Sequence, residues 1–378
     1  MATCNKDEEL AKRGRKTDMR ITFLLPGLGI AGGIRSTFEL ANRLQDRGHH
    51  ISVVYPLIRM ESGAKWYNFR QLAGRIRGTI GNLTGGNYVR WFDLKANLIR
   101  VPTLAERYIP KGDIIVATWW ANAYDVNSYG SDKGEKFYFI RHYETWGGPE
   151  DLVNKTYTLP LHRIVNSNWL KDLIGTKFNV PVLGPIRNGV NFDLFYKTRE
   201  DFRPHNPRRI GMVYRRARWK GMEDGFKAFE IAKTKFPGIQ LVLFGAKLGR
   251  QTPRGNEFHL LPTGSKLRDI YNSLDIFIFP SHYESWPNPP MEAMACGAAC
   301  IATNVGAVPD YTIDGKTGLI CPPHSPDKLA ECLMYLLENE DKRQEMAKVG
   351  YEHIQRFTWD ESVNQLEGIF NQMVRPFN

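Results

Sequence analysis

Short apolar runs alternate with stretches of helical periodicity along most of the chain. The runs at residues 20–25, 50–55, 114–119, 137–140 and 163–166 predict strands, and Phe38 and Leu44 lie on the apolar face of a helix between the first two. Apolar runs of this kind are typical of parallel strands covered on both faces. The first half of the chain therefore predicts a doubly wound α/β domain.

The pattern restarts after the turn-rich residues 187–195 and a proline-rich stretch that ends at Pro207. Strands are predicted at 209–214, 240–244, 276–280 and 299–303, and helices at 223–235, 266–272 and from Pro290 onward. A final helix is predicted at 358–374. We therefore expect a disordered tail at 1–18, one domain at 19–190 onto which residues 358–378 pack back, and a second domain at 191–357.

Length, cysteine use and charge restrict the protein class. The 378 residues suit two domains, and no apolar stretch approaches the roughly 18 residues that cross a bilayer. The N-terminal residues lack the apolar region of a secretory signal, and the five cysteines form no disulfide framework or CxxC pair. We expect a cytoplasmic protein with free thiols. The net charge of +11 is compatible with nucleic acid, an anionic membrane or phosphorylated substrates as partners.

Two carboxylates with seven residues between them carry the strongest chemical signal, in the segment SHYESWPNPPMEAMACG. With Asn288 as N-cap and Pro289 as first helical residue, Glu292 is predicted in the first turn of a helix, and Glu284 in the loop before it. A carboxylate at the carboxyl edge of a parallel sheet accepts the two hydroxyls of a ribose or pyranose well. Alternatively, Glu292 only complements the helix dipole and Glu284 is a solvated loop residue.

Basic and glycine-rich loops supply two further candidates. Lys220, with Arg215 or Arg216, follows a predicted strand in YRRARWKG and suits a diphosphate, although an exposed basic loop has the same composition. The loop PGLGIAGGIR opens a helix and exposes backbone N–H groups to an anion. The acidic residue of an NAD site is missing from the next strand, so NAD is disfavoured while NADP remains open.

His142 ends a predicted strand in FYFIRHYETW. Its place at the strand end puts it near the predicted ligand edge of the sheet, and packing beside the neighbouring aromatic residues is its alternative role. We expect His282, which lies two residues before Glu284, to be structural.

The segment ESWPNPPMEAMACG resembles the E-x7-E signature of family 4 retaining glycosyltransferases, which have the GT-B fold. The resemblance implies two Rossmann-like domains that face each other across a cleft, the first for the acceptor and the second for the nucleotide sugar. It implies that Glu292 binds the ribose and Glu284 the transferred sugar. Ser285 and Pro287 stand where family members often carry glycine. The resemblance further implies a donor-binding set that comprises Gly32, Gly33, Arg35, Arg216 and the backbone of Trp286, Asn288 and Met291, and a catalytic set of Arg215, Lys220, Glu284 and His142.

By this resemblance the protein moves a hexose or deoxyhexose, with retention, from a nucleoside-diphosphate sugar to a glycan or lipid-linked acceptor, in polysaccharide or glycan synthesis. Same-face attack is implied, with the leaving diphosphate accepting the acceptor's proton. The sequence contains no Asp-x-Asp, so we expect neither a metal nor a cofactor, and activity in excess chelator. The nucleotide base, the sugar, the acceptor, the linkage and the oligomeric state stay open. The alternatives are a GT-B epimerase or phosphorylase, and a basic membrane- or nucleic-acid-binding protein.

A basic segment rich in aromatic residues and glycine, at residues 57–100, is the candidate acceptor and membrane region. Its arginines Arg70, Arg75, Arg77 and Arg90 suit phosphates, and its aromatic rings suit sugars or a lipid interface. We expect peripheral contact with the inner face of an anionic membrane and no nucleic acid. A solvated loop is the alternative.

Overall fold

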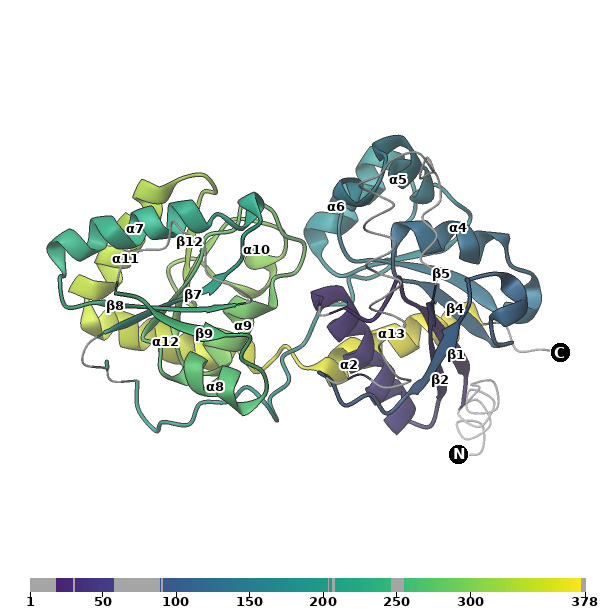
Figure 1. The fold of residues 1–378 in the computed structure, drawn as a ribbon, viewed down its shortest axis with the longest axis horizontal. Coiled ribbons are helices and arrows are strands. Elements are labelled where there is room, and N and C mark those ends of the chain that lie inside the picture. Colours follow the sequence, from purple (N-terminus) through teal and green to yellow (C-terminus); the bar gives the residue numbers. More distant parts are fainter. Residues whose placement is uncertain are drawn as a thin grey trace, which may run out of the picture. The chain divides into compact units, whose positions relative to one another are not determined.

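The structure is a computed structural model that describes residues 18–29, 31–57, 89, 91–202, 204–205, 208–245 and 255–374. The chain divides into two compact units, one formed by Met1–Ile186 with Trp359–Asn378 and the other by Arg187–Thr358 (Figure 1). Each unit is a parallel six-stranded sheet with helices on its faces. The two units are described separately below as the first and the second domain.

The first domain has the strand order β3-β2-β1-β4-β5-β6. Its strands are β1 (Arg20–Leu24), β2 (His50–Pro56), β3 (Asn97–Val101), β4 (Ile114–Ala117), β5 (Glu135–Ile140) and β6 (His162–Val165). Its α-helices are α2 (Gly32–Asp46), α4 (Trp120–Ser128), α5 (Glu150–Thr156), α6 (Asn168–Phe178) and α13 (Trp359–Met373). The strand order reverses between β1 and β4, and at such a switch point the loops at the carboxyl ends of the strands open a crevice for ligands.

The second domain repeats this topology with the order β12-β11-β10-β7-β8-β9, so its switch point lies between β7 and β10. Its strands are β7 (Arg209–Tyr214), β8 (Gln240–Gly245), β9 (Glu257–Leu260), β10 (Ile276–Phe279), β11 (Ala299–Thr303) and β12 (Leu319–Cys321). Its α-helices are α7 (Met222–Lys235), α8 (Ser265–Asn272), α9 (Asn288–Ala295), α10 (Val308–Tyr311), α11 (Pro326–Glu338) and α12 (Glu340–Ile354).

Both sheets are buried on both faces, as the apolar runs predict. In β10, Phe277 and Phe279 belong to one apolar cluster, whereas Ile276 and Ile278 belong to the cluster on the other face. This alternation follows from the two-residue repeat of a strand. Because the sheet interiors are filled by side chains, ligand chemistry is left to the loops at the strand ends.

The helix α13 packs into the core of the first domain although it follows the whole second domain in sequence. Phe370 makes an edge-to-face contact with Phe137 of β5, with ring centroids 5.0 Å apart. Glu367 accepts hydrogen bonds from Arg47 at 2.8 Å and pairs with the buried His49 at 3.0 Å. One apolar face of α13 therefore completes the cluster formed by β1, β2 and α2.

Three strands were not predicted from the sequence: β3, β9 and β12. Each lies at the edge of its sheet and is only partly buried. An edge strand covers less apolar surface than a central one, so its sequence carries a weaker hydrophobic signal.

Candidate functional site

The switch point of the second domain carries an ion pair between two residues singled out from the sequence. Lys220 follows β7 and Glu284 follows β10, two neighbouring parallel strands. The Lys220 ammonium Nζ contacts Oε1 of Glu284, and Ser281 donates its hydroxyl to the same oxygen at 3.1 Å. The Glu284 side chain is 13% exposed, so the carboxylate is reachable but largely desolvated. A cation and an acceptor for hydroxyls thus lie together where ligands bind in this topology.

Arg215 and Arg216 lie directly after β7, in the loop that leads to Lys220. Both side chains are exposed, and neither makes a hydrogen bond or ion pair with any described residue. Two uncommitted guanidinium groups beside Lys220 suit an anionic ligand. The geometry does not favour one arginine over the other.

Glu292 lies in the second turn of α9, which corrects the prediction that it lies in the first. The helix begins one residue earlier than predicted: Pro287 is the N-cap, Asn288 is the first helical residue and the first turn contains no acidic residue. Glu292 is 6% exposed and accepts a hydrogen bond from the Tyr271 hydroxyl at 2.9 Å. Glu292 therefore lies beyond the first turn and has a hydrogen-bond partner that orients its carboxylate, which disfavours the alternative that it only complements the helix dipole.

The other predicted residues of this segment are packed rather than open. The buried Trp286 indole donates to the Met291 sulfur at 3.1 Å, and Met291 is itself fully buried. The Asn288 side-chain oxygen accepts from the Asn188 amide at 3.1 Å. Their side chains therefore shape the loop, which leaves only backbone groups for a ligand.

Gly306 supports the same loop from β11's side. Its φ is +51°, and a Cβ there would lie 2.4 Å from the carbonyl oxygens of Glu284 and Ser285. The next residue, Ala307, donates its N–H to Ser285 O at 2.7 Å. Glycine at this position is therefore required for the close backbone approach that fixes the segment carrying Glu284.

The switch point of the first domain is built differently, around the exposed N-terminus of α2. The helix begins at Gly32 with no side-chain cap and no acidic residue in its first turn. Gly32 and Gly33 are exposed, and Arg35 is half-buried. Uncapped N–H groups at a helix start attract anions.

Arg141 is a residue that the sequence analysis missed. Its Nη1 donates to Gly33 O and, at 2.6 Å, to the Ser36 hydroxyl, and its guanidinium lies 4.5 Å above the Phe139 ring. Its Nε and Nη2 are buried and have no hydrogen-bond partner among the described residues. Burial lowers the pKa of Arg141. Spare donors beside an uncapped helix start are a second cationic site, and the position of Arg141 just after β5 is the signal that indicates it.

His142 and Glu144 continue the same loop. His142 Nδ1 lies 3.2 Å from Tyr143 O and 3.4 Å from the indole nitrogen of the exposed Trp146. Glu144 is buried and accepts the N–H of Trp120, the first residue of α4, at 2.8 Å. Burial raises the pKa of Glu144 to about 8. The loop after β5 thus presents a histidine to the surface and secures α4 with a buried carboxyl group.

The four candidate acceptor arginines, Arg70, Arg75, Arg77 and Arg90, lie outside the described residues. Two aromatic residues of the same segment are described, and they pack against the domain. Trp91 and Phe92 lie 5.5 and 5.3 Å from the Phe38 ring of α2. These two half-buried rings therefore pack against α2.

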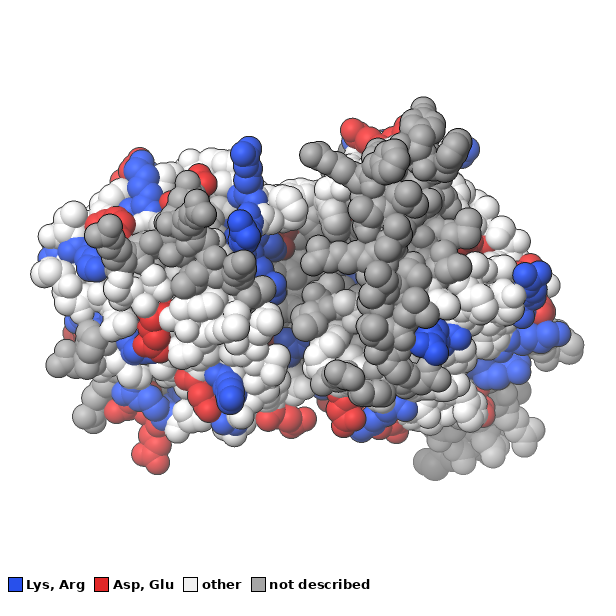
Figure 2. All heavy atoms as spheres, in the orientation of Figure 1, with Lys and Arg blue, Asp and Glu red and all other residues white. Residues whose placement is uncertain are grey.

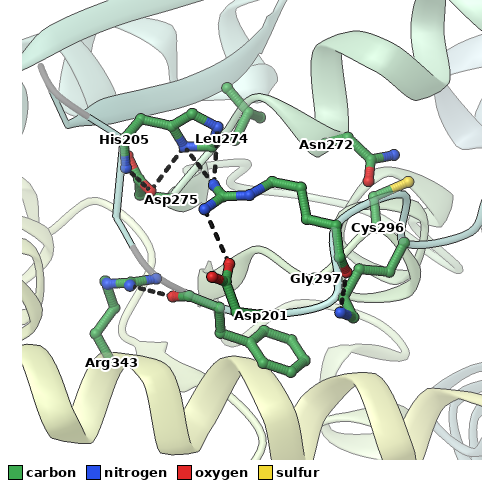
Figure 3. A pocket seen from close by; sticks show the side chains of 11 residues that line it. Asp201, His205, Asn272, Leu274, Asp275, Cys296, Gly297 and Arg343 are labelled. Atoms are coloured by element: carbon green, nitrogen blue, oxygen red, sulfur yellow. Dashed lines mark hydrogen bonds and ion pairs between the residues drawn. The ribbon is translucent and has the colours of Figure 1, made fainter.

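A pocket at the opposite end of the second domain is a polar anchoring point. Asp275, which precedes β10, accepts from His205 and from the backbone of Arg209, and Arg199 bridges His205 and Asp201 (Figure 3). Because Asp275 lies at the amino end of β10, this pocket is separated from Glu284 by the length of the strand.

The surface charge and the helices were compared with the two non-enzymatic alternatives, a nucleic-acid-binding protein and a membrane-binding protein. On the face drawn in Figure 2, the described Lys and Arg side chains are interspersed with Asp and Glu in both domains. None of the described helices is both long and apolar enough to cross a membrane. The described part of this face therefore offers no broad single-sign surface for a polyanion.

Comparison with known protein families gives a match that covers most of the second domain. Residues 197–353 match the model of the family glycosyl transferases group 1. The D-inositol 3-phosphate glycosyltransferase of Corynebacterium diphtheriae is 34% identical over 105 residues, which are 28% of this chain and 25% of that protein. The capsular polysaccharide biosynthesis glycosyltransferase CapM of Staphylococcus aureus is 25% identical over 230 residues, covering 57% and 60% of the two chains. The chain thus spans only about a quarter of the first of these relatives.

Solved structures extend the likeness to both domains. Sucrose-phosphate synthase of Thermosynechococcus elongatus aligns over 94% of this chain and 98% of its own with a TM-score of 0.69 and 17% identity. Anabaena HepE in complex with UDP aligns over 94% and 100% with a TM-score of 0.68 and 15% identity. At these identities the likeness establishes the fold alone. The predicted GT-B fold, with two Rossmann-like domains, is confirmed.

Proposed function

We propose that the protein is a retaining glycosyltransferase that moves a hexose or deoxyhexose from a nucleoside-diphosphate sugar to a glycan or lipid-linked acceptor. The observation that carries the proposal is the pair of Lys220 and Glu284 at the switch point of a domain that matches group 1 glycosyltransferases. This juxtaposition supplies the two chemistries that the donor requires. They are positive charge for the diphosphate and a carboxylate for sugar hydroxyls.

The diphosphate is the group that develops negative charge as the glycosidic bond breaks. In the proposed reaction, Lys220 exchanges its contact with Glu284 for the diphosphate, and Arg215 or Arg216 closes on the other phosphate oxygens. Glu284, released from the ammonium, accepts the sugar hydroxyls. Fixed cations lower the barrier because they stabilise the leaving group more in the transition state than in the bound donor.

Glu292 is the proposed ribose ligand. Its carboxylate is buried and is oriented by the hydrogen bond that it accepts from the Tyr271 hydroxyl. A buried carboxylate that binds two vicinal hydroxyls would select a ribonucleotide. Support for a nucleotide sugar also comes from HepE, which was solved with UDP and with UDP-glucose.

In the first domain we propose that the α2 N-terminus and Arg141 hold an anionic group of a substrate, beside Gly32, Gly33 and His142. The Arg141 donors that no described residue accepts, together with the exposed N–H groups at the start of α2, support this assignment. Cations and helix dipoles would then replace a metal ion on the phosphates, and no cofactor is required.

Product analysis tests the proposed reaction. The purified chain is incubated with a panel of UDP-, GDP- and dTDP-sugars and candidate acceptors, after the panel has been screened for thermal stabilisation. We expect nucleoside diphosphate to appear in step with a lengthened glycan that keeps the anomeric configuration of the donor. Nucleotide sugar converted to an isomer, or sugar phosphate formed without nucleoside diphosphate, would instead support an epimerase or a phosphorylase.

The acceptor side remains a proposal that rests on the basic segment at residues 57–100. If this segment receives a lipid-linked acceptor at an anionic membrane, replacing Arg70, Arg75 and Arg77 together with serine should release the protein from anionic liposomes. It should also raise the acceptor KM while donor affinity is unchanged, because each basic residue near an anionic surface contributes about 1 kcal/mol. Liposome flotation and acceptor kinetics measure both effects. Unchanged flotation and KM would reduce the segment to a solvated loop.

A further inference from the structure

Three potential metal ligands converge in the second domain, beside the loop that carries Glu284. Asp224 lies in the first turn of α7, His282 in the loop after β10, and His324 in the turn between β12 and α11. One ligand atom from each lies within 4.8 Å of the other two. Segments up to a hundred residues apart in sequence therefore present two imidazoles and a carboxylate to one point.

The spacing of these atoms is close to that of a metal site. His282 Nε2 lies 2.7 Å from Asp224 Oδ2, and the two imidazole rings lie 3.7 Å apart at 35°. A tetrahedral zinc ion bound at about 2.0 Å holds its ligand atoms about 3.3 Å apart. The pair of His282 and Asp224 thus needs to open by only a fraction of an ångström, and the His324 ring needs to turn, to admit a cation.

Two residues with positive φ, His324 and Gly221, bring the three side chains together. His324 has a φ of +58°, a left-handed conformation that non-glycine residues rarely adopt. Gly221, just before α7, has a φ of +59°, and a Cβ there would lie 2.9 Å from His282 Nε2 and 1.9 Å from Pro280 O. The glycine is therefore what lets the start of α7 approach His282.

We propose that Asp224, His282 and His324 bind one divalent transition-metal ion of the zinc class. Two imidazole nitrogens and one carboxylate oxygen are a ligand set that zinc uses with a fourth position left to water. The Asp224 and His282 side chains are largely buried and His324 is exposed, so the site is open to solvent on one side. Magnesium, which requires six oxygen ligands, is a poor match for two imidazoles.

The ion would tie together the two segments that carry the proposed donor site. Asp224 follows Lys220 by four residues, and His282 precedes Glu284 by two. The metal ligands are different residues from the Lys220 and Glu284 pair, so the ion would hold these segments together without displacing that pair. Metal binding itself does not depend on the proposed function. Only the expected effect of the ion on the donor site rests on that function.

Direct binding of the metal alone tests the proposal. The full chain is stripped with chelator, dialysed and titrated with Zn²⁺, and separately with Co²⁺ to record its visible absorption bands. We expect one equivalent to bind, Co²⁺ bands typical of a mixed nitrogen and oxygen site, and a higher Tm, because the ion binds only the folded state. Mg²⁺ should give none of these effects.

Two single substitutions locate the site. His324→Gly removes an exposed ligand while glycine keeps the left-handed backbone, so the variant should fold, and His282→Asn removes the second imidazole. Each should weaken Zn²⁺ binding by at least about tenfold and abolish the rise in Tm. His205→Asn is the matched control, because His205 also pairs with an aspartate in this domain, at 2.9 Å from Asp275, and should leave Zn²⁺ affinity unchanged.

Zn²⁺ that binds with unchanged affinity to both site variants, or no saturable binding to the native chain, would overturn the proposal. Binding of UDP, GDP and dTDP, measured in the same samples, separates this failure from a failure of the proposed function. A chain that binds zinc at these residues but transfers no sugar refutes only the transferase.

Discussion

The two switch points share one topology but hold their charges in opposite ways. In the second domain, Lys220 and Glu284 are partly exposed and satisfy each other. In the first, Arg141 is buried, two of its nitrogens have no partner in the described part of the chain, and the neighbouring Glu144 is buried with a raised pKa. The second domain therefore has an ion pair that a ligand can exchange, whereas the first has hydrogen-bond donors that are already desolvated. Equivalent sheet edges thus acquire different chemistry from their loops alone.

Removing the cation of the second switch point should have the largest effect. Lys220→Ala deletes charge stabilisation of the leaving diphosphate, so we expect kcat to fall about 100- to 1000-fold. Steady-state kinetics with a saturating donor measures this. The control is Lys227→Ala. Lys227 lies in α7, a few residues after Lys220, and pairs with Asp327 at 3.4 Å, so this variant should keep its activity. A loss of less than about tenfold in Lys220→Ala would contradict the proposed role of Lys220 on the leaving diphosphate.

Alanine substitutions of Glu284 and Glu292 should impair different steps. Glu292→Ala should weaken binding of the free nucleoside diphosphate, whereas Glu284→Ala should spare that binding and lower turnover, because its partners are sugar hydroxyls. A charge-assisted hydrogen bond contributes about 1.5 to 3 kcal/mol, so each loss should be roughly ten- to a hundredfold. Calorimetric titration with the diphosphate and donor kinetics give the two readouts. Equal diphosphate affinity in both variants contradicts the assignment.

The buried carboxyl of the first domain should appear in the pH dependence of stability. The pKa of Glu144 is raised from 4.5 to about 8 by burial, so its contribution is present below about pH 4.5 and is lost as the pH rises to 8. Relative to Glu144→Gln, the native chain should lose unfolding free energy on the order of a few kcal/mol across that window. Chemical denaturation of both proteins between pH 5 and 9 measures the difference. Parallel curves would mean that Glu144 is ionised in the fold.

The smallest effect is expected from chelation. If cationic side chains bear the diphosphate charge, turnover at saturating donor should persist in excess chelator and should not rise with Mg²⁺ or Mn²⁺. Loss of the proposed zinc ion on chelation should lower the Tm without abolishing turnover at saturating donor. A rate that collapses with chelator and returns with Mg²⁺ or Mn²⁺ would show that a metal performs the role given to Lys220 and the loop arginines.

Sequence reasoning recovered the central strands and the charged residues of the second switch point, because both leave local signals. Apolar runs such as IFIF of β10 are unambiguous, and Glu284 and Lys220 sit at strand ends that can be located from those runs. The edge strands β3, β9 and β12 were missed because their burial is partial, whereas the more deeply buried edge strand β6 was predicted. Arg141 was missed for another reason: its position just after β5 places it at the sheet edge, but its contact with Gly33, more than a hundred residues away, is encoded by no local pattern.

The packing of α13 has a consequence for how the chain is made. The second domain is one continuous segment, whereas the first needs a helix translated after it. During synthesis the apolar cluster around Phe38 and Phe137 therefore stays uncovered on one side until Phe370 and its neighbours leave the ribosome. The domain that begins first is completed last, and its exposed core is the part of the nascent chain that most needs protection from aggregation.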